Sequence, residues 1–279
     1  MVRANGVDLC VETFGDLTDP AILLIAGAGG SMLSWHEELC ERLAAGSRFV
    51  IRYDQRDTGR SVTYEPGAPG YSGGDLVEDA VGLLDALGRA RAHLVGISMG
   101  GALAQLVALD HPDRVASLTL ISTSAGAGDP DLPPMSEDLR ARFASAAAEP
   151  DWTDRAAVID YLVEDARPYA AGSRAFDEAA WRDLAERDFD RSLNIASSMK
   201  NHFLAEGGES WRHRLEEIAA PTLVIHGAED PLFPYGHGVA LATEIPSAKL
   251  LRLERTGHEL PRAVWDIVVP AVLRHTAAS

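Results

Sequence analysis

The segment Gly96-Ile97-Ser98-Met99-Gly100 constrains the fold of this chain more than any other segment does. It matches Gly-x-Ser-x-Gly and lies where an apolar run, residues 93–97, changes into a run of good helix formers. A sharp strand-to-helix turn strains the backbone of its central residue, and side chains on either flank would collide. A pattern with three fixed positions also arises by chance. With its flanks, however, this one predicts that the hydroxyl of Ser98 is a nucleophile above a sheet.

Short apolar runs alternate with helical patterns along the chain, which predicts an α/β fold with a mostly parallel sheet and helices on both faces. Several of the runs are apolar almost throughout, as strands buried on both faces are. The predicted strands are residues 7–14, 21–26, 48–54, 92–97, 116–122, 222–226 and 249–253. The predicted helices between them are residues 35–45, 75–87, 99–110, 238–244 and 262–275.

The rhythm changes between residues 124 and 219, where the sequence is helical and polar without a convincing strand. Helical stretches are expected near residues 136–148, 155–164, 176–186 and 192–204. The strand pattern resumes at Pro221. We therefore predict an α/β core of residues 1–123 and 220–279, with residues 124–219 as a helical cap, or lid, over the C-terminal ends of the strands.

Two polar residues later in the chain are suitable partners for Ser98. Asp230 follows the predicted strand 222–226, and His258 follows the predicted strand 249–253, so all three lie in loops at the same edge of the sheet. A serine hydroxyl needs a base to take its proton, and a histidine base needs a carboxylate that fixes its tautomer. We assign these roles to His258 and Asp230.

Other assignments stay open at this stage. Asp230 is also well placed to cap the helix that follows, and Glu229 is a rival carboxylate beside it. Among the histidines, His226 is the nearest rival of His258, because it too lies at a strand end. His226 directly precedes the loop that supplies the acid, which is a poor position from which to reach between that acid and Ser98.

Acyl transfer also needs hydrogen-bond donors for the oxyanion that develops on the substrate. The backbone N–H of Met99 is one donor, since it follows the nucleophile at the start of a helix. The loop Gly27-Ala28-Gly29-Gly30 allows close approach of the backbone to a ligand, and we choose the N–H of Ala28 as the second donor. The alternative is that this loop is merely a permissive turn.

Four motifs relate the chain to a known family: Phe14-Gly15-Asp16, the run of residues 52–61 (RYDQRDTGRS), Val95-Gly96-Ile97-Ser98-Met99-Gly100-Gly101, and His226-Gly227-Ala228-Glu229-Asp230-Pro231. The chain resembles the α/β-hydrolase superfamily over nearly its whole length, and within it is similar to the aclacinomycin methylesterase group. The resemblance implies the triad Ser98, Asp230 and His258 with oxyanion amides of Ala28 and Met99. Many relatives have His-Gly where this chain has Ala26-Gly27.

Several other residues near these motifs have two interpretations. Asp54 and Arg56 are expected to brace the loop beneath the site, so that Arg56 and Asp57 are not a catalytic pair. Trp35, Trp181 and His202 are candidates for a substrate pocket. Each of the three could equally serve to pack a helix or to hold the lid on the core, and the sequence does not separate these roles.

Composition limits the partners of this protein. A net charge of −17 opposes binding to nucleic acid or to an anionic membrane, and no apolar run approaches the roughly 20 residues of a membrane span. The first residues lack the apolar segment of a secretory signal, so we expect a cytoplasmic protein, a monomer or homodimer, whose Cys10 and Cys40 are reduced. Its expected partner is a small-molecule substrate, with no cofactor and no metal.

These features together predict a serine hydrolase that cleaves a carboxylic ester of a hydrophobic small molecule through an acyl-enzyme on Ser98. The resemblance narrows this to a methyl ester of a polyketide-like compound. Hydrolysis of an amide, a lactone or a C–C bond, or peracid formation, would use the same triad. From another class, a non-catalytic small-molecule receptor could have this fold, although its usual signature is a missing triad member.

Overall fold

The central element of the protein is a seven-stranded sheet in the order β3-β5-β4-β6-β7-β8-β9. The structure is a computed structural model that describes residues 1–126, 128–145 and 148–277. The strands are β3 (Val11–Phe14), β4 (Ala21–Ile25), β5 (Phe49–Tyr53), β6 (Ala92–Ile97), β7 (Val115–Ile121), β8 (Thr222–Gly227) and β9 (Lys249–Leu253). Of these seven strands β3 alone pairs antiparallel, so the predicted mostly parallel sheet is confirmed.

The predicted first strand, residues 7–14, is wrong as a single element. Its first half, β2 (Val7–Leu9), pairs antiparallel with β1 (Val2–Ala4) in a separate two-stranded sheet. Asn5 and Gly6 join these strands with φ of 43° and 76°, which is the two-residue type I′ hairpin turn. At Cys10 the chain leaves this hairpin, because the backbone N–H of Cys10 donates to the Ser61 hydroxyl at 2.8 Å before β3 joins the main sheet.

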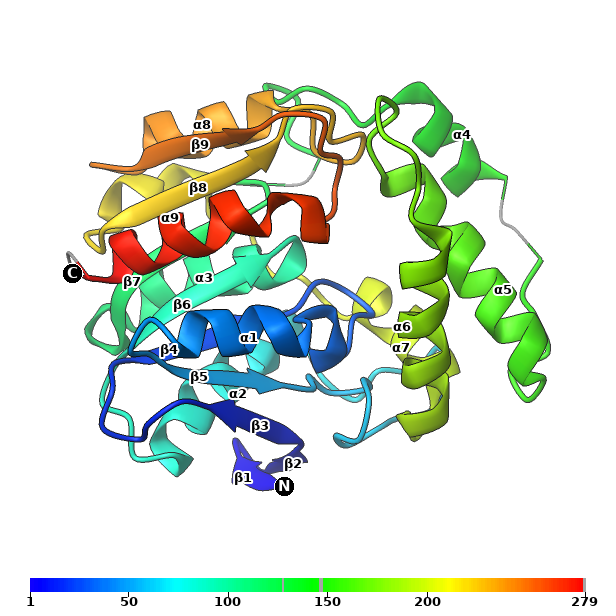
Figure 1. The fold of residues 1–279 in the computed structure, drawn as a ribbon, viewed down its shortest axis with the longest axis horizontal. Helices are drawn as coiled ribbons and strands as arrows, with labels where there is room; N and C mark the ends of the chain where they lie inside the picture. Colours follow the sequence, from blue (N-terminus) through cyan, green and yellow to red (C-terminus); the bar gives the residue numbers. More distant parts are fainter. Residues whose placement is uncertain (127, 146–147, 278–279) are drawn as a thin grey trace.

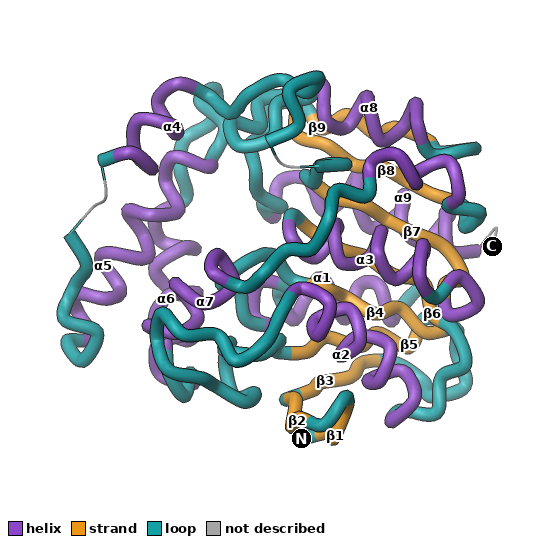
Figure 2. The backbone as a smooth tube through the Cα atoms, turned by 180° about the vertical axis from the view of Figure 1, so that it is seen from behind, coloured by secondary structure: helices purple, strands orange, loops and turns teal. Residues whose placement is uncertain are grey.

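Helices cover both faces of the sheet (Figures 1 and 2). On one face α1 (Glu37–Ala44) and α9 (Trp265–Ala277) pack in a core that includes Ile22 and Leu24 of β4. On the other face α2 (Gly73–Ala86), α3 (Met99–Asp110) and α8 (Gly236–Glu244) pack in a core that includes Leu23 and Ile25. Alternate residues of β4 thus serve opposite faces, which explains why this strand is apolar and buried throughout.

The segment between β7 and β8 is helical, as predicted from its sequence. Its helices are α4 (Glu137–Ala144), α5 (Arg155–Ala166), α6 (Glu178–Arg191) and α7 (Ile195–Leu204). They lie together beyond the ends toward which the parallel strands point, at the right of Figure 1. The first predicted helix, 136–148, ends at residue 144 in the structure, and Ala146 and Ala147 lie outside the described residues. The role of these helices as a lid stays a prediction.

None of the helices in the described ranges has the length and apolar character that crossing a membrane requires.

Candidate active site

The nucleophile turn has the geometry that its sequence predicts. Ser98 joins β6 to α3 with φ of 54° and ψ of −122°, a strained conformation for a residue other than glycine. A Cβ at Gly96 would overlap the carbonyl oxygen of Gly100, and a Cβ at Gly100 would overlap that of Ile25. Ser98 begins α3 without capping it through its side chain. Its hydroxyl is therefore left for another partner.

That partner is His258, which a separate loop supplies 160 residues later. Its Nε2 lies 2.9 Å from the Ser98 Oγ, and its Nδ1 lies 2.8 Å from the Asp230 Oδ2. A carboxylate accepts, so Nδ1 carries the proton and Nε2 is free to accept from the hydroxyl. The three residues that the sequence analysis selected thus form one continuous hydrogen-bonded chain.

Asp230 is held by its own turn. Its Oδ1 accepts the backbone N–H groups of Leu232 and Phe233, both at 2.9 Å, which leaves Oδ2 for His258. The carboxylate is buried, so these N–H donors replace the water that a charged group loses on burial. Gly227 lies so close to the loop before His258 that a Cβ there would overlap the carbonyl oxygen of Gly257. Acid and histidine are therefore presented by loops in direct contact.

The two rival residues have other partners. Glu229 accepts the N–H of Ser173 at 3.0 Å and its hydroxyl at 2.5 Å, and these bonds lower the pKa of Glu229. His226 is fully buried and donates from Nε2 to the carbonyl oxygen of Phe233 at 2.7 Å. Burial lowers the pKa of His226, so it is neutral. Within the described ranges neither residue forms a hydrogen bond with Ser98.

The loop after β4 forms a tight turn beside the nucleophile. Gly30 donates its N–H to the carbonyl oxygen of Gly27 at 3.2 Å, and Gly29 has φ of 73°, which identifies a type II turn over Gly27–Gly30. We call this the oxyanion turn. A Cβ at Gly27 would lie 3.3 Å from the Ser98 Cβ, so the turn borders the nucleophile. Among the described residues the N–H of Ala28 makes no hydrogen bond, which keeps it available to a substrate.

Comparison with known proteins shows the family of the chain. Residues 20–261 match the model of the alpha/beta hydrolase fold family. The chain belongs to the α/β-hydrolase family. It is 33% identical to a rhodomycin D methylesterase of Streptomyces sp. (strain C5), over all of this chain and 98% of that protein. It is 34% identical to a putative carbamate hydrolase of Variovorax paradoxus, over 88% of each chain.

Solved structures show the same fold. The enol-lactonase from Burkholderia xenovorans LB400 superposes with a TM-score of 0.76 at 24% identity, over 98% of each chain. This similarity, with the sequence matches above, confirms the predicted α/β-hydrolase fold and the resemblance to the methylesterase group.

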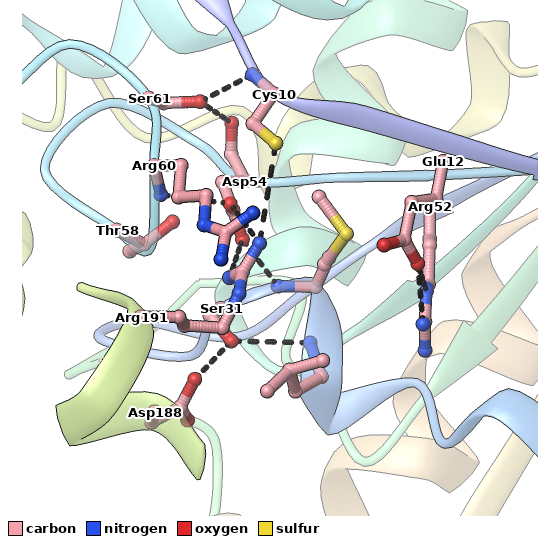
Figure 3. A network of polar contacts seen from close by, with 12 residues as sticks. Cys10, Glu12, Ser31, Arg52, Asp54, Thr58, Arg60, Ser61, Asp188 and Arg191 are labelled. Atoms are coloured by element: carbon pink, nitrogen blue, oxygen red, sulfur yellow. Dashed lines mark hydrogen bonds and ion pairs between the residues drawn. The ribbon is translucent and has the colours of Figure 1, made fainter.

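In this hydrolase the loops beneath the oxyanion turn are tied to α6 by a polar network (Figure 3). Asp54 is fully buried and accepts the N–H of Met32 at 2.9 Å and two N–H groups of Arg191, both at 2.9 Å. Asp188 accepts the hydroxyl of Ser31, and burial raises the pKa of Asp188 to about 6. The bracing role expected for Asp54 agrees with these bonds. Its partners on α6 were not predicted.

Arg56 also braces the site, as its sequence context suggested. Its guanidinium donates to both carboxylate oxygens of Asp79 on α2, each at 2.7 Å, and both side chains are buried. This two-bond geometry is the strongest that an arginine and a carboxylate can form. The guanidinium of Arg56 is thereby committed to Asp79.

The three pocket candidates lie in different surroundings. Trp35 is 2% exposed within the core against α1 and α9, which favours its packing role over a place in a pocket. Trp181 packs in a small apolar cluster between α5 and α6 and stacks on Phe176. His202, by contrast, borders a pocket of about 560 Å³ that Met99, Leu103 and Trp211 also line.

Proposed function

We propose that this α/β hydrolase is a serine esterase that removes the methyl group from a methyl ester of a bulky aromatic, polyketide-like compound. The observation on which the proposal depends is the hydrogen-bonded chain from Asp230 through His258 to Ser98. The full-length similarity to methylesterases at 33% and 31% identity supports the choice of a methyl ester.

The first half of the reaction would form an acyl-enzyme. As the Ser98 Oγ attacks the ester carbonyl carbon, its proton passes to the His258 Nε2, which lies 2.9 Å away. Asp230 stabilises the imidazolium through the bond to Nδ1. The tetrahedral intermediate then collapses: the C–O bond to the methoxy group breaks, and the His258 proton goes to that oxygen, so methanol leaves.

The second half of the reaction would hydrolyse the acyl-enzyme and regenerate the free enzyme. Water gives a proton to His258 and attacks the acyl carbon, and collapse of the second intermediate breaks the bond to the Ser98 Oγ, which takes the proton back. In both halves negative charge develops on the former carbonyl oxygen. We assign its stabilisation to the N–H groups of Ala28 and Met99, of which Met99 is the first residue of α3. Each such donor is worth about 2.7–4 kcal/mol.

We assign the large apolar acyl group of the substrate to the surroundings of Met99, the residue after the nucleophile. The pocket of about 560 Å³ beside Met99 is lined by side chains that are mainly apolar, including Leu76, Leu103, Leu106 and Trp211. Methanol, as the leaving group, needs little space. The proposal therefore places the aromatic system on the acyl side of the scissile bond.

Ser98→Ala tests this function. It should lower kcat for a methyl ester of an aromatic polyketide by at least about 10⁴-fold, because the nucleophile is gone while the backbone strain and packing remain. Methanol release would be measured, with near-UV circular dichroism to show that the variant is folded. Turnover equal to that of the parent would remove Ser98 from the mechanism. Faster cleavage of a matched carbamate or amide by the parent would replace the proposed substrate class.

A further inference from the structure

One side chain from the helices between β7 and β8 contacts the oxyanion turn through a hydrogen bond. The backbone N–H of Gly29 donates to the His202 Nδ1 at 3.0 Å. The His202 Nε2 lies 2.8 Å from the carbonyl oxygen of Arg56 in the loop after β5. His202 is 6% exposed and stands 173 residues from Gly29 in the sequence. It therefore joins two loops of the core through α7.

These partners determine the protonation state of His202. An N–H donates to Nδ1, so Nδ1 has no proton, and a carbonyl oxygen accepts from Nε2, so Nε2 has one. The ring is thus the neutral Nε2–H tautomer. Burial lowers the pKa of His202, which keeps the ring neutral at physiological pH. A proton on Nδ1 would break the bond to Gly29.

The bond to Gly29 fixes a part of the turn that the sequence leaves free. Type I and type II turns share the bond between their first and fourth residues and differ in the orientation of the middle peptide. In the oxyanion turn this is the peptide between Ala28 and Gly29. Glycine tolerates both orientations, so Gly29 does not select one by itself. An acceptor for its N–H on one side of the turn stabilises the type II form.

His202 is itself held rigidly. The Ser198 hydroxyl donates to the carbonyl oxygen of Asp57 at 2.5 Å, and the Asn201 Nδ2 donates to the Asp57 carboxylate at 2.9 Å. Both side chains are buried. The backbone of α7 also approaches the turn closely, since a Cβ at Gly29 would lie 3.1 Å from the carbonyl oxygen of Ser198. The imidazole is therefore a fixed acceptor.

We propose that His202 is a positioning residue for the oxyanion hole: by accepting the N–H of Gly29 it anchors the middle peptide of the turn over Gly27–Gly30, and so holds in place the adjoining peptide, which carries the N–H of Ala28. This inference rests on the proposed function, in which Ala28 is an oxyanion donor. It makes the position of that donor depend on a helix of the segment between β7 and β8.

Two variants separate the bonds of His202. In His202→Asn the amide oxygen lies about where Nδ1 lies in histidine. It can still accept from the Gly29 N–H, but the shorter side chain does not reach the Arg56 carbonyl oxygen. In His202→Gln the amide nitrogen lies about where Nε2 lies in histidine. It can donate to the Arg56 carbonyl oxygen, but the side chain has no acceptor near the Gly29 N–H. With an activated ester, we expect His202→Gln to lower kcat by about 10- to 100-fold at nearly unchanged KM. His202→Asn, which keeps the acceptor for Gly29, should lose clearly less kcat than His202→Gln.

A transition-state analogue provides the readout that packing alone would not change. The inhibition constant of a trifluoromethyl ketone should rise in His202→Gln by the factor by which kcat falls, because both depend on the oxyanion donors. Equal kcat in the two variants, or a lower kcat in His202→Gln with unchanged affinity for the ketone, would overturn the inference.

Nuclear magnetic resonance tests the inference without a variant. In the parent protein at pH 7.5, the ¹⁵N shifts of His202 should show the neutral Nε2–H tautomer, and the Gly29 amide should be protected from hydrogen exchange. A protonated ring or the other tautomer would overturn the inference. If instead the parent protein hydrolyses no ester while these signals are as expected, the proposed function fails and the bond from Gly29 to His202 stands.

Discussion

At the scale of single residues, the nucleophile turn is the part of this hydrolase that its sequence predicts most fully. The requirement is steric and local: Ser98 has a positive φ, and Gly96 and Gly100 have no room for a Cβ. The meeting of Asp230 and His258 beside Ser98 was predictable from their places after strands. The environment of His202 was not, because both of its partners are backbone groups of loops distant in sequence.

Gly100→Ala tests the steric requirement. The added methyl group would overlap the backbone of Ile25 and Ala26, which cannot move without disturbing β4. We expect a loss of unfolding free energy of about 3 kcal/mol or more, with loss of activity. The control is Gly74→Ala in α2, where the new Cβ meets only the Ser72 hydroxyl, at 3.5 Å. This change should leave stability equal or raise it by up to about 1 kcal/mol. Urea denaturation measures both, and equal stabilities would contradict the steric argument.

At the scale of elements, the buried strands were predictable because β4, β5 and β7 are mainly apolar, and they are buried throughout. The hairpin of β1 and β2 was missed although Asn5-Gly6 is a strong signal for a two-residue turn. The contact of α6 with the core has no such signal. It depends on the ion pair of Asp54 with Arg191, which lie 137 residues apart in the sequence. No local pattern specifies which helix approaches which loop.

Arg191→Ala tests that contact. It would leave the fully buried carboxylate of Asp54 without its charged partner, so we expect a loss of about 3–5 kcal/mol in unfolding free energy. Arg187→Ala is the matched control on α6, since the pair of Arg187 with Asp183 is exposed and should contribute at most about 0.5 kcal/mol. The comparison would be made by chemical denaturation. A similar small loss in both variants would show that Asp54 does not depend on Arg191.

At the scale of the whole molecule, the parallel sheet brings Ser98, Asp230 and His258 together, and their order along the chain was enough to predict this. The helices between β7 and β8 were predicted as helices, but their bonds to the core were not. Asp188 makes one of those bonds, because its carboxylate accepts the hydroxyl of Ser31 in the loop after β4. Burial raises its pKa from 3.8 to about 6. At a pH between these two values the carboxyl group is mostly protonated in the folded state and mostly ionised in the unfolded state.

This difference predicts how stability depends on pH. Between pH 4 and pH 6 the folded state binds more protons at Asp188 than the unfolded state, so this residue's contribution to stability falls as the pH rises through that window. Asp188→Asn keeps an acceptor for Ser31 and does not titrate. The unfolding free energy of the parent minus that of Asp188→Asn should therefore fall by about 1 kcal/mol or more from pH 4 to pH 6.5. A difference that is constant with pH would contradict the shift.

The central claim is that the Ser98 hydroxyl attacks the ester and holds the acyl group. Rapid acid quench of the parent protein during turnover of an activated ester, followed by mass spectrometry of its peptides, tests this directly. The account predicts a mass increase equal to one acyl group on the peptide that contains Ser98, and none in Ser98→Ala. Acylation of a different residue, or ester turnover unaffected by Ser98→Ala, would contradict it.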